Sequence, residues 1–428
     1  MTPPARTEAA IGLLEQILSL PDTPADRLVS GWFRQRRYAG AKDRAYITNL
    51  VYTVLRRRAE LEWALGHDDV GIANPRELTA TALALDEGLS DADLGNRFSG
   101  ATHAPAVLTA EEQGRVSALR RDFTAAPDWV RGNYPPSLDA AFREVFGDDV
   151  TIEVPALAER APVDLRVNTL RATRDEAIAA LAEDGINAQT TPLSPVGLRL
   201  DARANIAGSD AFREGLVEVQ DEGSQLIALL LGAQPGETVV DWCAGGGGKT
   251  LGIAAAMQNK GRILAFDVSR DRLEAAQVRI DRAGARMVTT HLLDGAPQVM
   301  ADRVLVDAPC SGSGAWRRNP ATKWRTSPER IAEFAQRQTA ILEDAARAVR
   351  PGGVLLYATC SLFRAENHDQ VDAFLRSHRD FRLGSIATQW RHIIGGEPPS
   401  EMPLLLLTPF ENKTDGFFMA LFERKADA

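Results

Sequence analysis

The feature of this sequence that most constrains its fold is a regular alternation of short apolar runs and helical segments after residue 236. The apolar runs are bounded by Gly, Asp or Pro and read TVVDWC, GRILAFDV, MVTTHLL, RVLVDAPC and GGVLLYATC. Such alternation is typical of an α/β domain with a doubly wound parallel sheet. A long connecting helix is predicted from Ser327 to Pro351, and the segment 416–424 is expected to pair at one edge of the sheet.

The first 66 residues are predicted to form amphipathic helices. Their apolar residues recur at helical spacing in two stripes, Ile11, Leu14, Ile17 and Leu18, then Ile47, Leu50, Val51 and Leu55. The pattern weakens from residue 71 to residue 130, which we interpret as linker or residual helix. An N-terminal all-α domain over residues 1–130 is therefore expected.

Residues 131–235 are expected to form a small α+β module. Helices are predicted from Leu138 to Phe146 and from Arg174 to Leu181, with strands in VDLRVNTL and near Leu198 and Val217. The α/β domain then occupies residues 236–428.

Bulk properties exclude several classes of protein. The chain has 428 residues, of which 44% are hydrophobic, so folded domains are expected rather than a disordered tether. We find no signal-peptide pattern and no apolar stretch near the ~20 residues of a membrane span, which predicts a cytoplasmic protein. Its three cysteines, Cys243, Cys310 and Cys360, have neither disulfide nor zinc spacing, so no metal is expected.

Charge is distributed unevenly along the chain. A net charge of -9 argues against a nonspecific nucleic-acid coat. Residues 34–58, however, contain a single acid, Asp43, and eight basic residues: Arg34, Arg36, Arg37, Lys42, Arg44, Arg56, Arg57 and Arg58. This cluster is either a solvated helix face or a phosphate-binding surface.

A glycine-rich turn follows the first strand of the α/β domain, in the run DWCAGGGGKT. In a doubly wound sheet such a turn lets a ligand approach the backbone. A phosphate-binding loop would need Gly at Cys243, and a GxGxxG motif starting at Gly245 would need Gly at Thr250. The turn therefore favours an adenosine-bearing ligand other than ATP or NAD, with a purely structural turn as the alternative.

Acidic residues stand at the ends of the next two strands. Asp267 is well placed to accept hydrogen bonds from ribose hydroxyls, and Arg272 is expected to brace it. Asp294 follows the third strand and is expected on the adenine side. Each acid alone is more often a helix cap or a solvated turn, but three such strand ends in register favour a binding site.

Two cysteine motifs follow apolar strands directly: DAPCSGSG from Asp307 and TCS from Thr359. Both thiols should emerge at the edge of the sheet where ligands bind, although a lone cysteine is more often buried and inert. Cytosine C5 is a weak nucleophile, and addition of a thiolate at C6 activates it toward a methyl donor. Protonation at N3 assists that addition, which gives an acid such as Asp307 a role.

These motifs resemble the Sun/Nop family of RNA cytosine-5 methyltransferases, and the resemblance covers about residues 130–428. It also includes RVNTLR from Arg166, VQDEGSQ from Val219, the GGKT turn, PATKWR from Pro320, Glu366-Asn367 and TDGFF from Thr414. The resemblance implies a Rossmann-like class I methyltransferase domain that uses S-adenosylmethionine.

The resemblance also implies roles for individual residues. Cys360 would form the covalent bond to C6, Cys310 would help release the product, and Asp307 and Lys249 would complete the catalytic set. The expected cofactor contacts are Cys243, Ala244, Gly245, Gly246, Gly247, Gly248, Lys249, Asp267, Arg272, Asp294 and Asp307. One departure is that the family usually has Ala-Pro where this chain has Gly245-Gly246, which predicts a more flexible turn.

The first 66 residues are similar to the helical, antitermination-factor-like RNA-binding domain of bacterial rRNA members of this family. The pair of cysteines favours RNA over DNA, and an unpaired or extruded cytosine is expected. The expected substrate is 16S-type small-subunit rRNA, and the enzyme is expected to act as a monomer. Between the motifs, four basic residues could steer the RNA backbone or form a solvated loop: Arg317, Arg318, Lys323 and Arg325.

Three alternatives remain open at this point. The chain could modify tRNA instead of rRNA, or it could be a noncatalytic ribosome-assembly protein with a degenerate fold. The third alternative, a small-molecule methyltransferase or dehydrogenase, is disfavoured by the paired cysteines and the basic N-terminal helices.

Overall fold

The computed structural model describes residues 1–20, 23–295 and 298–427, and the chain divides into two compact units. The helical unit consists of Met1–Arg160 and Trp316–Pro328, and the sheet unit consists of Ala161–Ala315 and Glu329–Ala428. Whether the expected domains, with boundaries at 130 and 235, fold independently stays a prediction.

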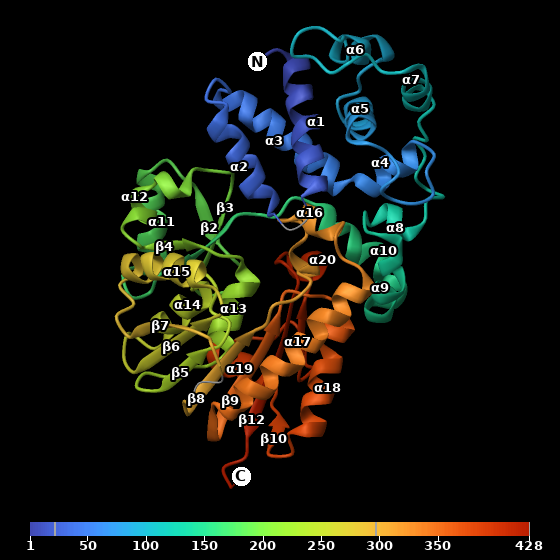
Figure 1. Ribbon diagram of the computed structural model, residues 1–428. Helices are drawn as coiled ribbons and strands as arrows, with labels where there is room; N and C mark the ends of the chain where they lie inside the picture. Colours follow the sequence, from blue (N-terminus) through green and yellow to red (C-terminus); the bar gives the residue numbers. More distant parts are fainter. Residues whose placement is uncertain (21–22, 296–297, 428) are drawn as a thin grey trace. The chain divides into compact units, whose positions relative to one another are not determined.

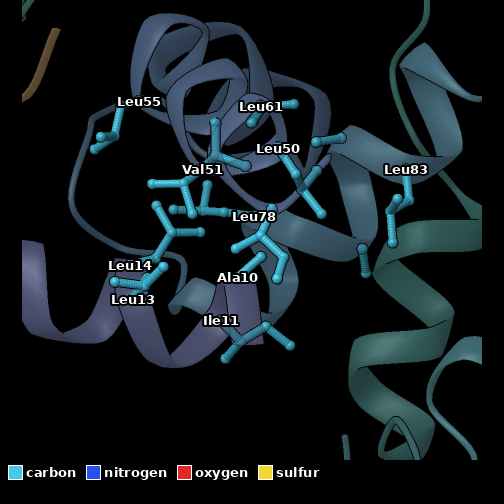
Figure 2. Packing of buried hydrophobic residues seen from close by; sticks show 14 of the residues in the cluster. Ala10, Ile11, Leu13, Leu14, Leu50, Val51, Leu55, Leu61, Leu78 and Leu83 are labelled. Carbon is cyan, nitrogen blue, oxygen red and sulfur yellow. The ribbon is translucent and has the colours of Figure 1, made fainter. Parts of the chain in front are cut away.

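The helical unit begins with a series of helices (Figure 1). They are α1 Pro3–Ser19, α2 Ala25–Gln35, α3 Ala41–Arg56, α4 Arg58–Ala64, α5 Pro75–Asp86, α6 Asp91–Arg97, α7 Ala110–Ser117, α8 Asp128–Arg131, α9 Asp139–Phe146 and α10 Val150–Glu153. Residues of α1 to α7 form one apolar core. Of the two predicted stripes, Ile11, Leu14, Leu50, Val51 and Leu55 meet in this core, as Figure 2 shows.

The stretch after residue 71 is helical rather than a linker. Leu78 and Leu83 of α5 enter the same core as α1 and α3 (Figure 2). The amphipathic pattern is weak there because eight successive residues of α5, from Glu77 to Ala84, are buried, so the helix has no polar stripe to alternate with an apolar one. Asn74 marks the helix start by accepting hydrogen bonds from the backbone of Arg76 and Glu77.

Some members of the basic cluster of residues 34–58 form ion pairs inside the helical unit. Arg57 pairs with Glu60 and Asp86, and Arg58 lies 3.6 Å from the buried Glu62. The members that are exposed to solvent are Arg34, Arg37, Lys42 and Arg44. A basic surface of this unit is therefore smaller than the sequence suggests.

The segment between the two cysteine motifs is not a solvated loop at its basic residues. Lys323, at the end of α16 (Pro320–Lys323), is 1% exposed and donates to the Arg56 carbonyl at 3.1 Å. Arg325 donates to the Ile17 carbonyl at 3.0 Å, and Arg317 is buried. The suggestion that these residues steer an RNA backbone is wrong for Lys323 and Arg317, because both side chains are enclosed by the protein.

The sheet unit begins with a small antiparallel sheet of order β2-β3-β1-β4. Its strands are β1 Asp164–Val167, β2 Ala188–Thr190, β3 Gly197–Leu200 and β4 Val217–Val219, with α11 Arg174–Glu183 and α12 Asp210–Arg213 beside them. Apolar residues from all of these elements except β2 form a separate buried cluster that includes Leu165, Leu181 and Val217. The predicted α+β character of this region is confirmed.

The large sheet has the order β7-β6-β5-β8-β9-β12-β10, with β11 also paired to β12. Its strands are β5 Thr238–Asp241, β6 Arg262–Asp267, β7 Val288–Leu292, β8 Ala301–Asp307, β9 Val349–Thr359, β10 Phe381–Leu383, β11 Leu405–Leu407 and β12 Phe417–Arg424. Strands β5 to β9 run parallel, as the apolar runs predict. From β5 the chain passes to β6 and β7 on one side, and then to β8 and β9 on the other side. This reversal of strand order creates a crevice beside β5.

Helices connect and cover these strands (Figure 1). They are α13 Glu222–Leu230, α14 Gly248–Ala256, α15 Arg270–Ala283, α17 Pro328–Arg347, α18 His368–Ser377, α19 Ile386–Ile393 and α20 Pro409–Asn412. The expected edge position of segment 416–424 is wrong. Strand β12 pairs antiparallel with β9 on one side and with the short strands β10 and β11 on the other, so its backbone groups find hydrogen-bond partners along both edges.

No helix in the described part of the chain is long and apolar enough to cross a membrane.

Candidate active site

A cavity of about 520 Å³ opens at the carboxyl ends of the parallel strands. Eleven residues named from the sequence line it: Cys243, Ala244, Gly245, Gly246, Gly248, Lys249, Asp267, Arg272, Asp307, Cys310 and Cys360. Two others do not. Gly247 instead precedes α14 as its N-cap residue with a left-handed backbone, φ 77°, and Asp294 is exposed after β7.

The glycine-rich turn is tied to the end of β6. The Gly245 amide donates to Asp267 Oδ2 at 2.9 Å, and the Ser269 amide donates to Asp267 Oδ1 at 2.8 Å. The predicted brace is present but loose, since Arg272 Nη1 lies 4.0 Å from Asp267 Oδ2. Each oxygen of Asp267 keeps a lone pair for another donor, so the same carboxylate can shape the turn and receive a ligand.

The two thiols meet at the wall of this cavity. Strands β8 and β9 are paired in register, with Asp307 opposite Ala358, so the loops that follow leave the sheet side by side. Cys310 Sγ and Cys360 Sγ lie 3.4 Å apart. The hydrogen bond with Cys360 and burial together raise the pKa of Cys310 well above its usual range.

Glu366 forms hydrogen bonds with both cysteine loops. Its carboxylate accepts from the Ser311 amide at 2.8 Å, the Ser311 hydroxyl at 2.5 Å, the Ser361 hydroxyl and the Gln338 amide at 3.1 Å. Ser311 and Ser361 are the residues directly after the two cysteines. The buried carboxylate therefore holds both loops to one point, which the sequence motif alone does not disclose.

Asn367 completes this support. It accepts from the Thr359 hydroxyl at 2.6 Å and donates to the Ser361 carbonyl at 2.8 Å. Gly314 and Gly416 also pack backbone to backbone, because a Cβ on Gly314 would lie 2.2 Å from the Gly416 carbonyl oxygen. The DAPCSGSG, TCS, Glu-Asn and TDGFF motifs thus meet around the two thiols.

Charged groups line the cavity between the turn and the thiols. Lys249 Nζ donates to Asp307 Oδ2 at 2.6 Å. Burial acts to lower the pKa of Lys249, but the Asp307 carboxylate outweighs it and the net shift is upward. Burial raises the pKa of Asp241 to about 7 and also raises that of the Cys243 thiol.

Sequence reasoning missed Arg279, which lines the cavity and donates from Nη1 to the Gly246 carbonyl at 2.6 Å. Gln220 and Ser224 also reach the lining. They lie in VQDEGSQ, which is part of the family resemblance but has no role assigned from the sequence. No short-range signal marks Arg279, because it lies more than thirty residues from the turn it contacts.

Two family models match this chain. One, described as 16S rRNA methyltransferase RsmB/F, matches residues 228–423, and the other, the ferredoxin-like domain of RsmF/B-like methyltransferases, matches residues 134–207. The probable ribosomal RNA small subunit methyltransferase B of Synechocystis sp. is 32% identical over 437 residues, covering 94% of this chain and 95% of that protein. The chain belongs to the 16S rRNA methyltransferase RsmB/F family.

Solved structures agree with the fold of this RsmB/F-family methyltransferase. The crystal structure of PH0851 has a TM-score of 0.77 and 29% identity, and the alignment covers 99% of both chains. The structure of NSun6 from Pyrococcus horikoshii with SFG shares the fold, with a TM-score of 0.59 and 22% identity over 68% of this chain and 98% of that chain. The Sun/Nop resemblance and the Rossmann-like class I methyltransferase fold are both confirmed.

RsmB/F-family membership makes this protein an S-adenosylmethionine-dependent RNA methyltransferase. The lining of the cavity fits that cofactor: Asp241, Asp267 and Asp307 are complementary to a ligand that carries sulfonium and ammonium charges. Asp241 Oδ1 is buried without a hydrogen-bond partner in the described part of the protein. Among the described residues, no group of three or more His, Cys, Asp or Glu side chains is arranged to hold a metal ion.

Proposed function

We propose that this enzyme methylates carbon 5 of a cytosine in small-subunit rRNA through a covalent bond between Cys360 and C6 of the base. The observation that carries this proposal is the 3.4 Å separation of the Cys310 and Cys360 sulfurs at the wall of the cofactor cavity. Two thiols so close to one ligand cavity suit a reaction that needs one sulfur to attack and another to assist its departure.

Attack by the Cys360 thiolate on C6 makes C5 electron-rich. S-adenosylmethionine supplies the electrophilic methyl group. Loss of the C5 proton to a base then restores the C5–C6 double bond and expels the Cys360 sulfur. The departing thiolate receives a hydrogen bond from Cys310, whose raised pKa supports a thiol that keeps its proton beside Cys360.

Asp307 is the acid for N3 of the cytosine. Its contact with Lys249 supports this role, because the ammonium 2.6 Å from Oδ2 holds the proton that the carboxyl group passes to N3 and leaves Oδ1 for the base. Lys249 therefore positions Asp307 and replaces the proton that Asp307 gives to the base. Protonation at N3 withdraws electrons from C6 and makes the thiolate addition easier.

The cofactor-binding residues are those that line the cavity: Cys243, Ala244, Gly245, Gly246, Gly248 and Lys249 of the turn, with Asp267, Arg272 and Asp307. Asp267 receives the ribose hydroxyls, as its free lone pairs allow. Asp294, which the sequence places on the adenine side, lies outside the cavity lining and is not among the proposed cofactor contacts.

The target cytosine is unpaired or extruded, since both sulfurs lie in a cavity and not on an open surface. Residues 1–130 bind RNA backbone through the exposed members of the basic cluster, Arg34, Arg37, Lys42 and Arg44. We infer that the enzyme acts in the cytoplasm, on 16S-type rRNA. A tRNA substrate is the alternative.

The decisive experiment replaces each thiol and looks for RNA attached to protein on a denaturing gel. With an unmodified 16S transcript and S-adenosylmethionine, Cys310→Ala should accumulate a covalent adduct and Cys360→Ala should form none. Cys243→Ala, which removes the third thiol of the cavity, should accumulate no adduct. The reverse pattern for Cys310 and Cys360 would exchange their roles.

The position of the methyl group is checked separately by mass spectrometry of nucleosides from the wild-type reaction. We expect 5-methylcytidine from the 16S transcript and none from a tRNA mixture. Methylation at an exocyclic nitrogen or at a ribose oxygen would contradict the covalent route. Binding of the 16S transcript without methyl transfer to it would contradict the assignment of that RNA as the substrate.

A further inference from the structure

The backbone of the glycine-rich turn is held by arginines that belong to a network with the small antiparallel sheet. Arg279 Nη1 donates to the Gly246 carbonyl at 2.6 Å. Arg166 Nη1, from strand β1, donates to the Gly248 carbonyl and to Gln220 Oε1 at 2.7 Å. Two carbonyls of the turn are thus fixed from outside the large sheet.

Glu218 of strand β4 orients Arg279. Its Oε2 accepts from Arg279 Nε at 3.1 Å and from Nη2 at 2.9 Å, and its Oε1 accepts from Arg282. Glu218 is 3% exposed and does not line the cavity. Two guanidinium nitrogens of Arg279 thus donate to one buried oxygen, which fixes the direction of the guanidinium group more firmly than a single surface contact does.

A close approach at α14 makes the Arg166 contact possible. A Cβ on Gly252 would lie 3.0 Å from Arg166 Nη1 and 2.8 Å from the Ala228 Cβ. The glycine therefore leaves the space through which Arg166 reaches the first turn of the helix. Arg166 is itself buried, and burial lowers its pKa to about 10, so it remains charged at neutral pH.

We propose that Arg166, Glu218 and Arg279 are positioning residues for the cofactor, and that they set its affinity by fixing the carbonyls of Gly246 and Gly248. Four successive glycines, from Gly245 to Gly248, would otherwise sample many backbone conformations and lose that freedom on binding. The arginine contacts restrict the turn before the ligand arrives. This inference rests on the proposed cofactor site in the cavity beside the turn.

The test compares Glu218→Gln and Arg279→Lys with wild type, using isothermal titration with S-adenosylmethionine and steady-state methyl transfer to the 16S transcript. Each variant should raise the dissociation constant about tenfold, because a charge-assisted hydrogen bond to the turn is lost or weakened. At saturating S-adenosylmethionine, kcat and the KM for RNA should stay within about twofold of wild type. The Glu218 variant excludes direct ligand contact, since that residue does not line the cavity.

The matched control is Arg282→Lys. Arg282 lies on the same helix as Arg279 and pairs with the same carboxylate. Within the described part of the chain, its side chain makes no hydrogen bond or ion pair with the turn. Its dissociation constant should match that of wild type. Equal effects at Arg279 and Arg282, or unchanged affinity in Glu218→Gln and Arg279→Lys, would overturn the proposal.

Asp267→Ala separates this inference from the proposed function. If that variant binds S-adenosylmethionine normally, the assigned cofactor site is wrong. If Asp267→Ala loses binding while Glu218→Gln and Arg279→Lys keep it, the site stands and the positioning role fails. Circular dichroism of each variant confirms folding at the titration temperature. A variant that loses thermal stability but keeps its affinity for S-adenosylmethionine counts against the positioning role.

Discussion

Lys249 Nζ donates a hydrogen bond of 2.6 Å to Asp307 Oδ2, and both side chains line the cavity that holds the two thiols. Lys249 comes from the first turn of α14, while Asp307 ends strand β8, so the contact joins the cofactor turn to the cysteine motif. The contact therefore links the proposed cofactor site to the proposed site of the cytosine. Disturbing this pair should therefore affect chemistry more than it affects folding.

We expect Lys249→Met to lower the single-turnover rate of methyl transfer by about 100-fold, since an oriented acid contributes roughly that much to a proton-transfer step. Lys249→Arg keeps a positive donor and should retain more activity than Lys249→Met. The measurement is transfer of labelled methyl to the 16S transcript at saturating cofactor. A wild-type rate in Lys249→Met would remove Lys249 from the catalytic set.

Glu366→Gln should slow adduct formation by Cys360 strongly while leaving S-adenosylmethionine affinity unchanged. The carboxylate accepts four hydrogen bonds, and an amide in its place would turn an NH2 group toward donors from Ser311, Ser361 or Gln338. Such a mismatch costs about 1–3 kcal/mol in the free energy of unfolding and shifts the two cysteine loops.

The checks are quench-flow detection of the protein–RNA adduct and titration of the cofactor. The same substitution at the exposed Glu343 serves as the control and should change neither quantity. Adduct formation at the wild-type rate in Glu366→Gln would show that the loops hold their geometry without this carboxylate.

Lys323→Met should stabilise the protein more at pH 7 than at pH 10. Burial lowers the pKa of Lys323 from 10.5 to about 7 in the folded chain, so folding becomes less favourable as the pH falls from 10.5 toward 7. The gain from removing the amine is therefore small above pH 10.5 and grows as the pH falls toward 7.

Thermal unfolding at the two pH values measures this difference. Lys42→Met changes an exposed lysine of the same helical unit and should shift Tm equally at pH 7 and pH 10. An equal shift for Lys323→Met at both pH values would contradict the assigned burial of the charge.

Much of the fold was predictable because its signals are local. Five apolar runs bounded by turn residues predicted β5 to β9, and the periodicity of Ile11, Leu14, Leu50 and Val51 predicted two helices of the N-terminal core. The sequence left residues 71–130 open between linker and residual helix, because α5 is buried on nearly every side and carries alanine and threonine in place of an apolar stripe. Strand β12 was assigned to an edge because an isolated apolar run does not reveal how many partners it has.

The amino-acid sequence by itself determined the parallel sheet, the glycine turn, the acids at the strand ends and the identity of the two cysteines, since each depends on neighbours a few residues away. Only the tertiary structure decided that the two sulfurs lie 3.4 Å apart, that Glu366 ties their loops together and that Arg166 and Arg279 hold the turn. It also decided that Lys323 is enclosed and Asp294 is not part of the cavity. These relations depend on strand register and on side chains that meet across long separations in the chain, and local propensity carries no information about either.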